Sequence, residues 1–136
     1  MKELVTEADR KNLWDVQAFI DEQLEEVGCP MLTQTAIDVA VEELFVNIAS
    51  YAYDQGNGVV EVQTALYENP LSIDITFIDN GRQYDPLAKD DPDITLSLKE
   101  RKKGGLGIFM VKESMDNVSY EYTDGKNILT IKKNLN

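Results

Sequence analysis

Three glycines within four residues form the segment most suited to binding a phosphate. Gly104, Gly105 and Gly107 stand directly before an apolar segment with helical character. Glycines let a backbone curl around phosphate oxygens, and a helix N-terminus offers unpaired N–H donors and a partial positive charge. The segment matches neither the Walker A pattern nor the dinucleotide-binding pattern, whose last glycine position is occupied by Met110. Taken alone, it predicts either an anion site or a flexible hinge.

A second group of residues has the chemistry of an adenine pocket. Asp79-Asn80-Gly81 closes the most apolar strand-like run of the chain. The exocyclic amine of adenine is a donor and a carboxylate is a pure acceptor, while a glycine lets the backbone approach a flat ring closely. The same tripeptide is also common turn chemistry, so by itself it indicates adenine binding only weakly.

A third feature is a glutamate and an asparagine one helical turn apart. Glu43 and Asn47 lie in a segment with apolar residues at helical spacing, and about 100° of rotation per residue places both on one edge of the apolar stripe. Glu42 falls almost opposite that stripe and is expected to face water. Glu43 is therefore the glutamate expected at the rim of a cleft, although a solvated surface position is the simpler interpretation of this pair alone.

Together and in this order, the three features resemble a known family. Glu43-x-x-x-Asn47, Asp79-x-Gly81 and Gly105-x-Gly107 match the N, G1 and G2 boxes of the Bergerat ATP-binding superfamily. The residues around the three boxes are similar to those of the small anti-sigma serine-protein kinases in this superfamily. The resemblance covers about residues 33–133, and the first helix matches only in type.

The resemblance implies a role for each matching residue. Asn47 would hold Mg²⁺ against the ATP phosphates, with water and phosphate oxygens completing the octahedron. Glu43 would be the general base, and Asp79 would read adenine with Gly81 close to the ring. The implied cofactor-binding residues are Asn47, Asp79, Gly81, Gly104, Gly105, Leu106, Gly107 and Thr130. Residues 85–103 would form an ATP lid in which Lys102 or Lys103 reaches the γ-phosphate, and a last polar contact near adenine would come from Asn127 or Thr130.

The resemblance also implies an activity and partners. The chain would transfer the γ-phosphoryl group of ATP to a serine or threonine of a STAS-type anti-anti-sigma protein, and its ATP-bound form would hold a sigma factor. The alternative is a regulatory binding module that uses ATP only to order its interface. A detached histidine-kinase catalytic domain is disfavoured because no histidine-bearing dimerisation helix is present. A homodimer is left open.

The elements that must position these residues follow from hydrophobic periodicity. Thr6 resembles the first residue of a capping box, and Thr33 can cap a second helix. The patterns predict helices at 8–28, 33–53 and 107–115, strands at 60–66 and 71–77, and a hairpin of 118–123 with 127–133 across Asp124-Gly125. This order predicts a single α+β domain over 1–136. Its architecture would be a two-layer sandwich with a mixed, mostly antiparallel sheet and helices on one face.

Composition narrows the class of protein further. The 136 residues carry a net charge of −12, contain no histidine, and have Cys29 as the only cysteine. A Ser-His-Asp triad and a Cys/His zinc site are thereby excluded, and so acidic a surface disfavours nucleic acid as a direct partner. No apolar run suits a signal peptide or a membrane span, so a cytoplasmic protein without a membrane partner is expected.

Overall fold

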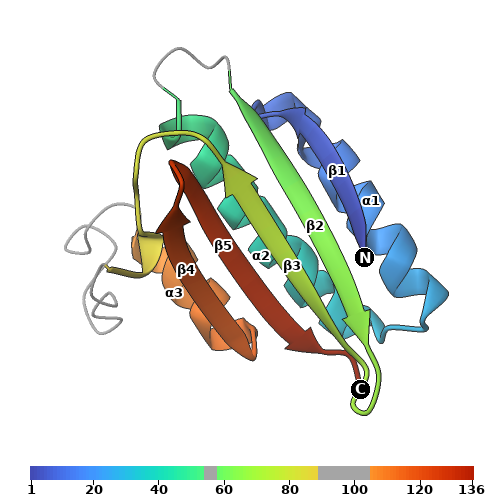
Figure 1. The fold of residues 1–136 in the computed structure, drawn as a ribbon. Helices are drawn as coiled ribbons and strands as arrows, with labels where there is room; N and C mark the ends of the chain where they lie inside the picture. The colour runs from blue at the N-terminus through green and yellow to red at the C-terminus, as the bar shows by residue number, and fades with distance from the viewer. Residues whose placement is uncertain (54–57, 89–104) are drawn as a thin grey trace.

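The computed structural model describes residues 1–53, 58–88 and 105–136. Figure 1 shows the strands and helices in the order in which they follow along the chain. The elements are β1 (Lys2–Glu7), α1 (Leu13–Glu26), α2 (Met31–Tyr51), β2 (Val59–Tyr67), β3 (Ser72–Asp79), α3 (Gly105–Ser114), β4 (Asn117–Thr123) and β5 (Lys126–Asn134), with 3₁₀ turns at Arg10–Asn12 and Pro86–Ala88.

Within the described residues, five strands form one sheet in the order β1-β2-β3-β5-β4, and every neighbouring pair is antiparallel. The three helices lie together on one face of this sheet, with α2 behind its centre, α1 toward β1 and α3 toward β4 (Figure 1). The expected α+β sandwich with helices on one face is confirmed. A mixed, mostly antiparallel sheet was expected, and every described strand pair is antiparallel.

The core lies between the sheet and the helices. Alternate residues of β2, β3 and β5 face inward because side chains of a strand point to opposite faces in turn. The inward set packs on the apolar stripes of α1 and α2, which repeat every three or four residues. The buried core includes Val16, Ile20, Leu24, Val41, Leu44, Phe45, Val62, Ile75, Phe77 and Ile131.

The start of the chain differs from the prediction. Residues 2–7 form the edge strand β1, and Thr6 lies within it rather than capping a helix. Asp9 is the capping residue instead, because its side chain accepts a hydrogen bond from the Lys11 amide at 3.0 Å and begins the 3₁₀ turn before α1. The strand was missed because only Leu4 packs against the core, so its sequence carries almost no apolar alternation.

Helix α1 begins later than expected, at Leu13 rather than at residue 8, whereas the other two helices begin earlier. Helix α2 starts at Met31, directly after Pro30, so Thr33 lies inside it. Helix α3 starts at Gly105 and includes Gly107, which the sequence placed before or at the helix start. Of the described helices, none is long and apolar enough to cross a membrane.

Candidate functional site

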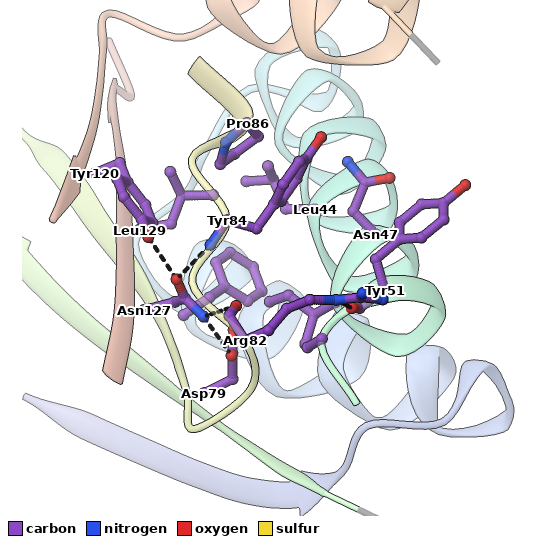
Figure 2. A pocket seen from close by; sticks show the side chains of 13 residues that line it. Leu44, Asn47, Tyr51, Asp79, Arg82, Tyr84, Pro86, Tyr120, Asn127 and Leu129 are labelled. Carbon is purple, nitrogen blue, oxygen red and sulfur yellow. Dashed lines mark hydrogen bonds between the residues drawn. The ribbon is translucent and has the colours of Figure 1, made fainter. Parts of the chain in front are cut away.

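A pocket opens between the second half of α2 and the ends of β3, β4 and β5 that lie toward the segment after β3 (Figure 2). Its apolar walls come from both layers of the fold: Leu44 and Ile48 on α2, Phe77 on β3, and Leu129 on β5. Apolar walls around a few convergent polar groups are typical of small-molecule sites. The polar groups here are contributed mainly by Asn47, Asp79, Arg82, Tyr84, Tyr120 and Asn127.

Asp79 is the buried acceptor of this pocket. It is the last residue of β3, and its side chain is only 5% exposed. Its Oδ1 atom accepts hydrogen bonds from the Gly81 amide and from Asn127 Nδ2, both at 2.9 Å. Burial raises the pKa of Asp79 above its ordinary value, while these two hydrogen bonds work in the opposite direction. Both donors hold one carboxylate oxygen in place, as a residue that reads a ligand amine requires.

Asn127 organises the polar side of the pocket. Its Nδ2 donates to Asp79 and to the Arg82 carbonyl at 2.9 Å, and its Oδ1 accepts from the Tyr84 amide at 3.1 Å and from the Tyr120 hydroxyl. These bonds are drawn in Figure 2. A single amide therefore joins β5, β4 and the segment after β3. Because Asn127 lies directly opposite Asp79 in the β3–β5 register, this arrangement follows from strand pairing.

The structure separates the two residues that the sequence left as alternatives. Asn127 lines the pocket, whereas Thr130 does not. Thr130 lies on the opposite face of the sheet, since it is an odd number of residues from Asn127, and it bonds Thr76 of β3 at 3.0 Å. Thr130 therefore points away from the pocket, and Asn127 is the one of the two residues that lines it.

Gly81 packs on the end of α2. A Cβ atom at this position would lie 2.2 Å from the Ala52 carbonyl oxygen, a distance that backbone atoms cannot accommodate. The next residue, Arg82, donates its amide to the same carbonyl at 3.0 Å and its Nε to the Tyr51 carbonyl at 3.0 Å. The glycine therefore allows the chain to turn tightly under α2 and keep the pocket closed on that side. Its closeness to a bound ring stays a prediction.

Glu43 and Asn47 lie on the same edge of α2 but open onto different spaces. Asn47 lines the pocket, and Figure 2 shows it beside Tyr51. Glu43 instead lines a groove between α2 and α3. There it touches Gly107, where a Cβ atom would lie 2.0 Å from Glu43 Oε1. Glu42 is exposed, as the helical rotation predicts.

The glycine-rich segment is only partly described. Gly105 and Gly107 belong to the first turn of α3, so the helix predicted from residue 107 begins two residues earlier. Gly104, Lys102 and Lys103 lie outside the described residues, and so does the side chain of Leu106. Of the expected lid, the described part extends from Asp85 to residue 88 and contains the 3₁₀ turn Pro86–Ala88.

The sequence reasoning missed several lining residues, among them Arg82, Tyr84 and Tyr120. Arg82 and Tyr84 lie in the segment after β3, which has no periodicity to place them, and Tyr120 lies on β4. Only Tyr120 carried a usable signal. It shares the inward parity of β4 with Val118 and packs against the core.

Comparisons with known proteins identify relatives of this chain. The serine/threonine-protein kinase BtrW of Bordetella bronchiseptica is 28% identical over 95 residues, which cover 70% of this chain and 66% of BtrW. The serine-protein kinase RsbW of Halalkalibacterium halodurans is 32% identical over 93 residues, covering 65% of this chain and 56% of that protein. RsbW of Bacillus cereus is 30% identical over 98 residues, with coverages of 69% and 60%. The chain thus spans between 56% and 66% of the length of these relatives.

Solved structures share the fold. The RsbU and RsbW domains of Rv1364c from Mycobacterium tuberculosis superpose with a TM-score of 0.64 at 18% identity, over 99% of this chain and 33% of that one. The SiaB–SiaC complex of Pseudomonas aeruginosa gives 0.60 at 16%, over 98% and 89%. The family model of the histidine kinase-like ATPase domain matches residues 6–133. Because this family model matches nearly the whole chain, the chain belongs to the histidine kinase-like ATPase domain family, and the nucleotide of this family is ATP.

Proposed function

We propose that this chain is an ATP-dependent protein kinase that phosphorylates a serine or threonine of a STAS-type anti-anti-sigma protein, and that its ATP-bound form holds a sigma factor. The observation that carries the proposal is the placement of Glu43 and Asn47. They share one edge of α2, yet Asn47 lines the pocket and Glu43 lines the groove beside α3. One edge of α2 therefore presents a polar group to each of two spaces. Such an edge can bind a nucleotide in one space and offer a general base to a second molecule in the other. The named relatives are serine or serine/threonine kinases, which supports the same activity.

Asp79 would select the base of the nucleotide. Gly81 and Asn127 occupy Oδ1 of this carboxylate, so its other oxygen is the acceptor available to the amine of adenine. The surrounding apolar side chains, among them Ile48 and Phe77, suit a flat aromatic ring. The base would therefore bind at the end of the pocket where β3 finishes.

Asn47 would hold Mg²⁺. Among the described residues, no cluster of three or more His, Cys, Asp or Glu side chains could hold a metal ion alone. Mg²⁺ in kinase sites needs few protein ligands because it keeps waters and takes phosphate oxygens. Asn47 lines the pocket, and an amide oxygen is a ligand that Mg²⁺ accepts, so Asn47 suits this role. The ion, when bound with ATP, neutralises charge that develops during phosphoryl transfer.

Glu43 would act as the general base. Its carboxylate lies on the groove side of α2, where a hydroxyl of a second protein can approach. In the proposed reaction the hydroxyl oxygen bonds to the γ-phosphorus while the bond to the β-phosphate oxygen breaks and ADP leaves, and Glu43 accepts the hydroxyl proton. Because this transfer depends mainly on positioning and charge stabilisation, the base is expected to contribute about 10²–10⁴-fold.

The test is phosphoryl transfer from radiolabelled ATP to purified STAS-domain proteins encoded in the same genome. Glu43→Gln keeps the shape of the side chain and removes the proton acceptor, so ATP affinity should stay within a few-fold while the rate falls by about 10²–10⁴-fold. Glu42→Gln is the matched control, because Glu42 is exposed and neighbours Glu43 in sequence. If Glu43→Gln is as fast as wild type, or wild type phosphorylates none of these proteins, the kinase proposal fails. A nucleotide-gated binding module without phosphotransfer would then replace it.

A further inference from the structure

A groove lies between α2 and α3 and shares no lining residue with the pocket described above. It has a volume of about 530 Å³ and is separate from the pocket that contains Asp79. Leu32 and Val39 of α2 and Met110 of α3 line it on opposite sides. Helix α2 is apolar around much of its circumference, so it presents one apolar face to the sheet and a second one to this groove.

The apolar side chains of the groove are exposed to an unusual degree. Leu32 is 86% exposed, Val39 is 54% exposed and Met110 is 53% exposed. Single exposed apolar residues are common on soluble proteins, but a contiguous set lining a concavity marks a binding surface. All three belong to the groove, so the surface is continuous across two helices.

Glu43 is the ionisable side chain among the described residues that line the groove. Its carboxylate touches Gly107 of α3, where any side chain would occupy the space of the carboxylate oxygens. A molecule bound along the apolar walls would therefore meet one carboxylate, at a point one helical turn from Asn47 and the nucleotide pocket.

We propose that this groove docks the segment of the partner protein that carries the acceptor serine or threonine, with apolar side chains flanking the hydroxyl. The inference rests on the proposed kinase function, because it gives the same Glu43 its substrate. Two observations favour this occupant: the groove is continuous with the proposed base, and no lysine or arginine among the described residues lines it to receive an acidic segment. With a net charge of −12, the chain also repels acidic segments at longer range.

The test compares two matched double variants with the STAS-domain proteins encoded in the same genome as substrates. Val39→Gln with Met110→Gln makes the groove polar without placing a charge near Glu43, and both positions are more than half exposed, so the fold is retained. Val5→Gln with Val59→Gln makes the same kind of change at positions 59% and 46% exposed on the sheet face away from the helices. Val39→Ile with Met110→Leu keeps the groove apolar.

The groove variant should raise KM for the STAS protein at least about tenfold, the loss expected when two apolar side chains no longer dock. The value of kcat at saturation and the Kd for ATP should change less than about threefold, and the other two double variants should behave as wild type. Unchanged KM in the groove variant, with wild type active, overturns the docking proposal and leaves the kinase standing. Sedimentation that shows the groove variant turning a dimer into a monomer would assign the groove to a second copy and overturn the proposal too. A wild type that phosphorylates no STAS protein removes the kinase function and this docking site with it.

Discussion

Replacing Asp79 by asparagine should weaken ATP binding without weakening the fold. In the wild type, Oδ1 of Asp79 is held by the Gly81 amide and Asn127 Nδ2 at 2.9 Å each. An asparagine can keep both bonds by placing its carbonyl oxygen in the same position. Its NH₂ group then occupies the place of Oδ2 and faces the amine of adenine, so two donors oppose each other.

The size of the effect follows from the burial of the site. Asp79 is 5% exposed, so the unpaired amine of a bound adenine would find little water. Leaving such a donor unsatisfied costs about 1–3 kcal/mol, or roughly 5- to 150-fold in Kd. The effect on stability has the opposite sign. Burial raises the pKa of Asp79, which means that the folded state disfavours the charged carboxylate at neutral pH. A neutral asparagine removes this unfavourable contribution, so the Tm of the nucleotide-free variant should equal or exceed that of wild type.

Calorimetric titration with Mg²⁺-ATP and Mg²⁺-GTP, together with thermal unfolding of the nucleotide-free proteins, measures both effects. GTP should bind wild type poorly because its carbonyl oxygen would face the carboxylate, and the preference for ATP over GTP should shrink in Asp79→Asn. Asp124→Asn is the matched control, since Asp124 lies exposed in the β4–β5 turn and does not line the pocket. An ATP affinity that survives the Asp79 change, or a wild type that binds GTP as well as ATP, would show that Asp79 serves only the turn after β3.

Two further predictions concern α2. Asn47→Ala should weaken Mg²⁺-ATP binding by about tenfold or more yet leave adenosine binding within about threefold, because the amide is assigned to the ion rather than to the base; equal losses for both ligands in calorimetry would contradict the assignment. Asp38 is paired with Asp21 of α1, and burial, the hydrogen bond to Asp21 and the negative charges of Asp21 and Glu25 raise its pKa to about 7. A carboxyl group whose folded pKa is raised stabilises the protein below its unfolded pKa and loses that contribution as pH rises toward 7. Asp38→Asn should therefore raise Tm by about 4 °C at pH 8, a value that allows for solvent screening. The variant should also show a smaller fall in Tm between pH 5 and pH 8 than wild type. A Tm profile parallel to that of wild type would refute the pairing of Asp38 with Asp21.

The sequence was most informative where a pattern repeats with a fixed period. The alternation in residues 71–77 and the helical spacing of Ile37, Val41, Leu44 and Ile48 predicted β3 and α2 to within a few residues. Those two elements carry Asp79 and Asn47 of the pocket and Glu43 of the groove, so these three positions could be predicted. The edge strand β1 could not be predicted. It pairs with one neighbouring strand only, and it buries little apolar surface.

Details that depend on tertiary contact were not accessible to sequence reasoning. The conformational freedom of Gly81 suggested an approach to a ring, but the position requires glycine because the Ala52 carbonyl lies where a Cβ would be. Whether Asn127 or Thr130 faces the pocket depends on strand parity, and a shift of one residue reverses every side chain. Only the pairing of Asp79 with Asn127 across β3 and β5 determines that parity.

The position of α2 would allow one helix to contact both proposed ligands. Four residues along a helix advance about 6 Å and rotate through about 40° beyond a full turn, so Glu43 and Asn47 stay adjacent while the helix surface curves from the pocket to the groove. In the proposed arrangement the nucleotide base and the protein substrate would not compete for the same walls. The nucleotide base would contact β3, β5 and one side of α2, and the substrate would contact α3 and the other side. The two ligands would meet at the polar edge of α2, where the phosphoryl group would be transferred. Gly107 of α3 lies directly against the Glu43 side chain. Any displacement of the first turn of α3 would therefore change the space around Glu43, the proposed general base. Nucleotide contacts at that turn would thereby be coupled to substrate docking through a single pair of touching residues.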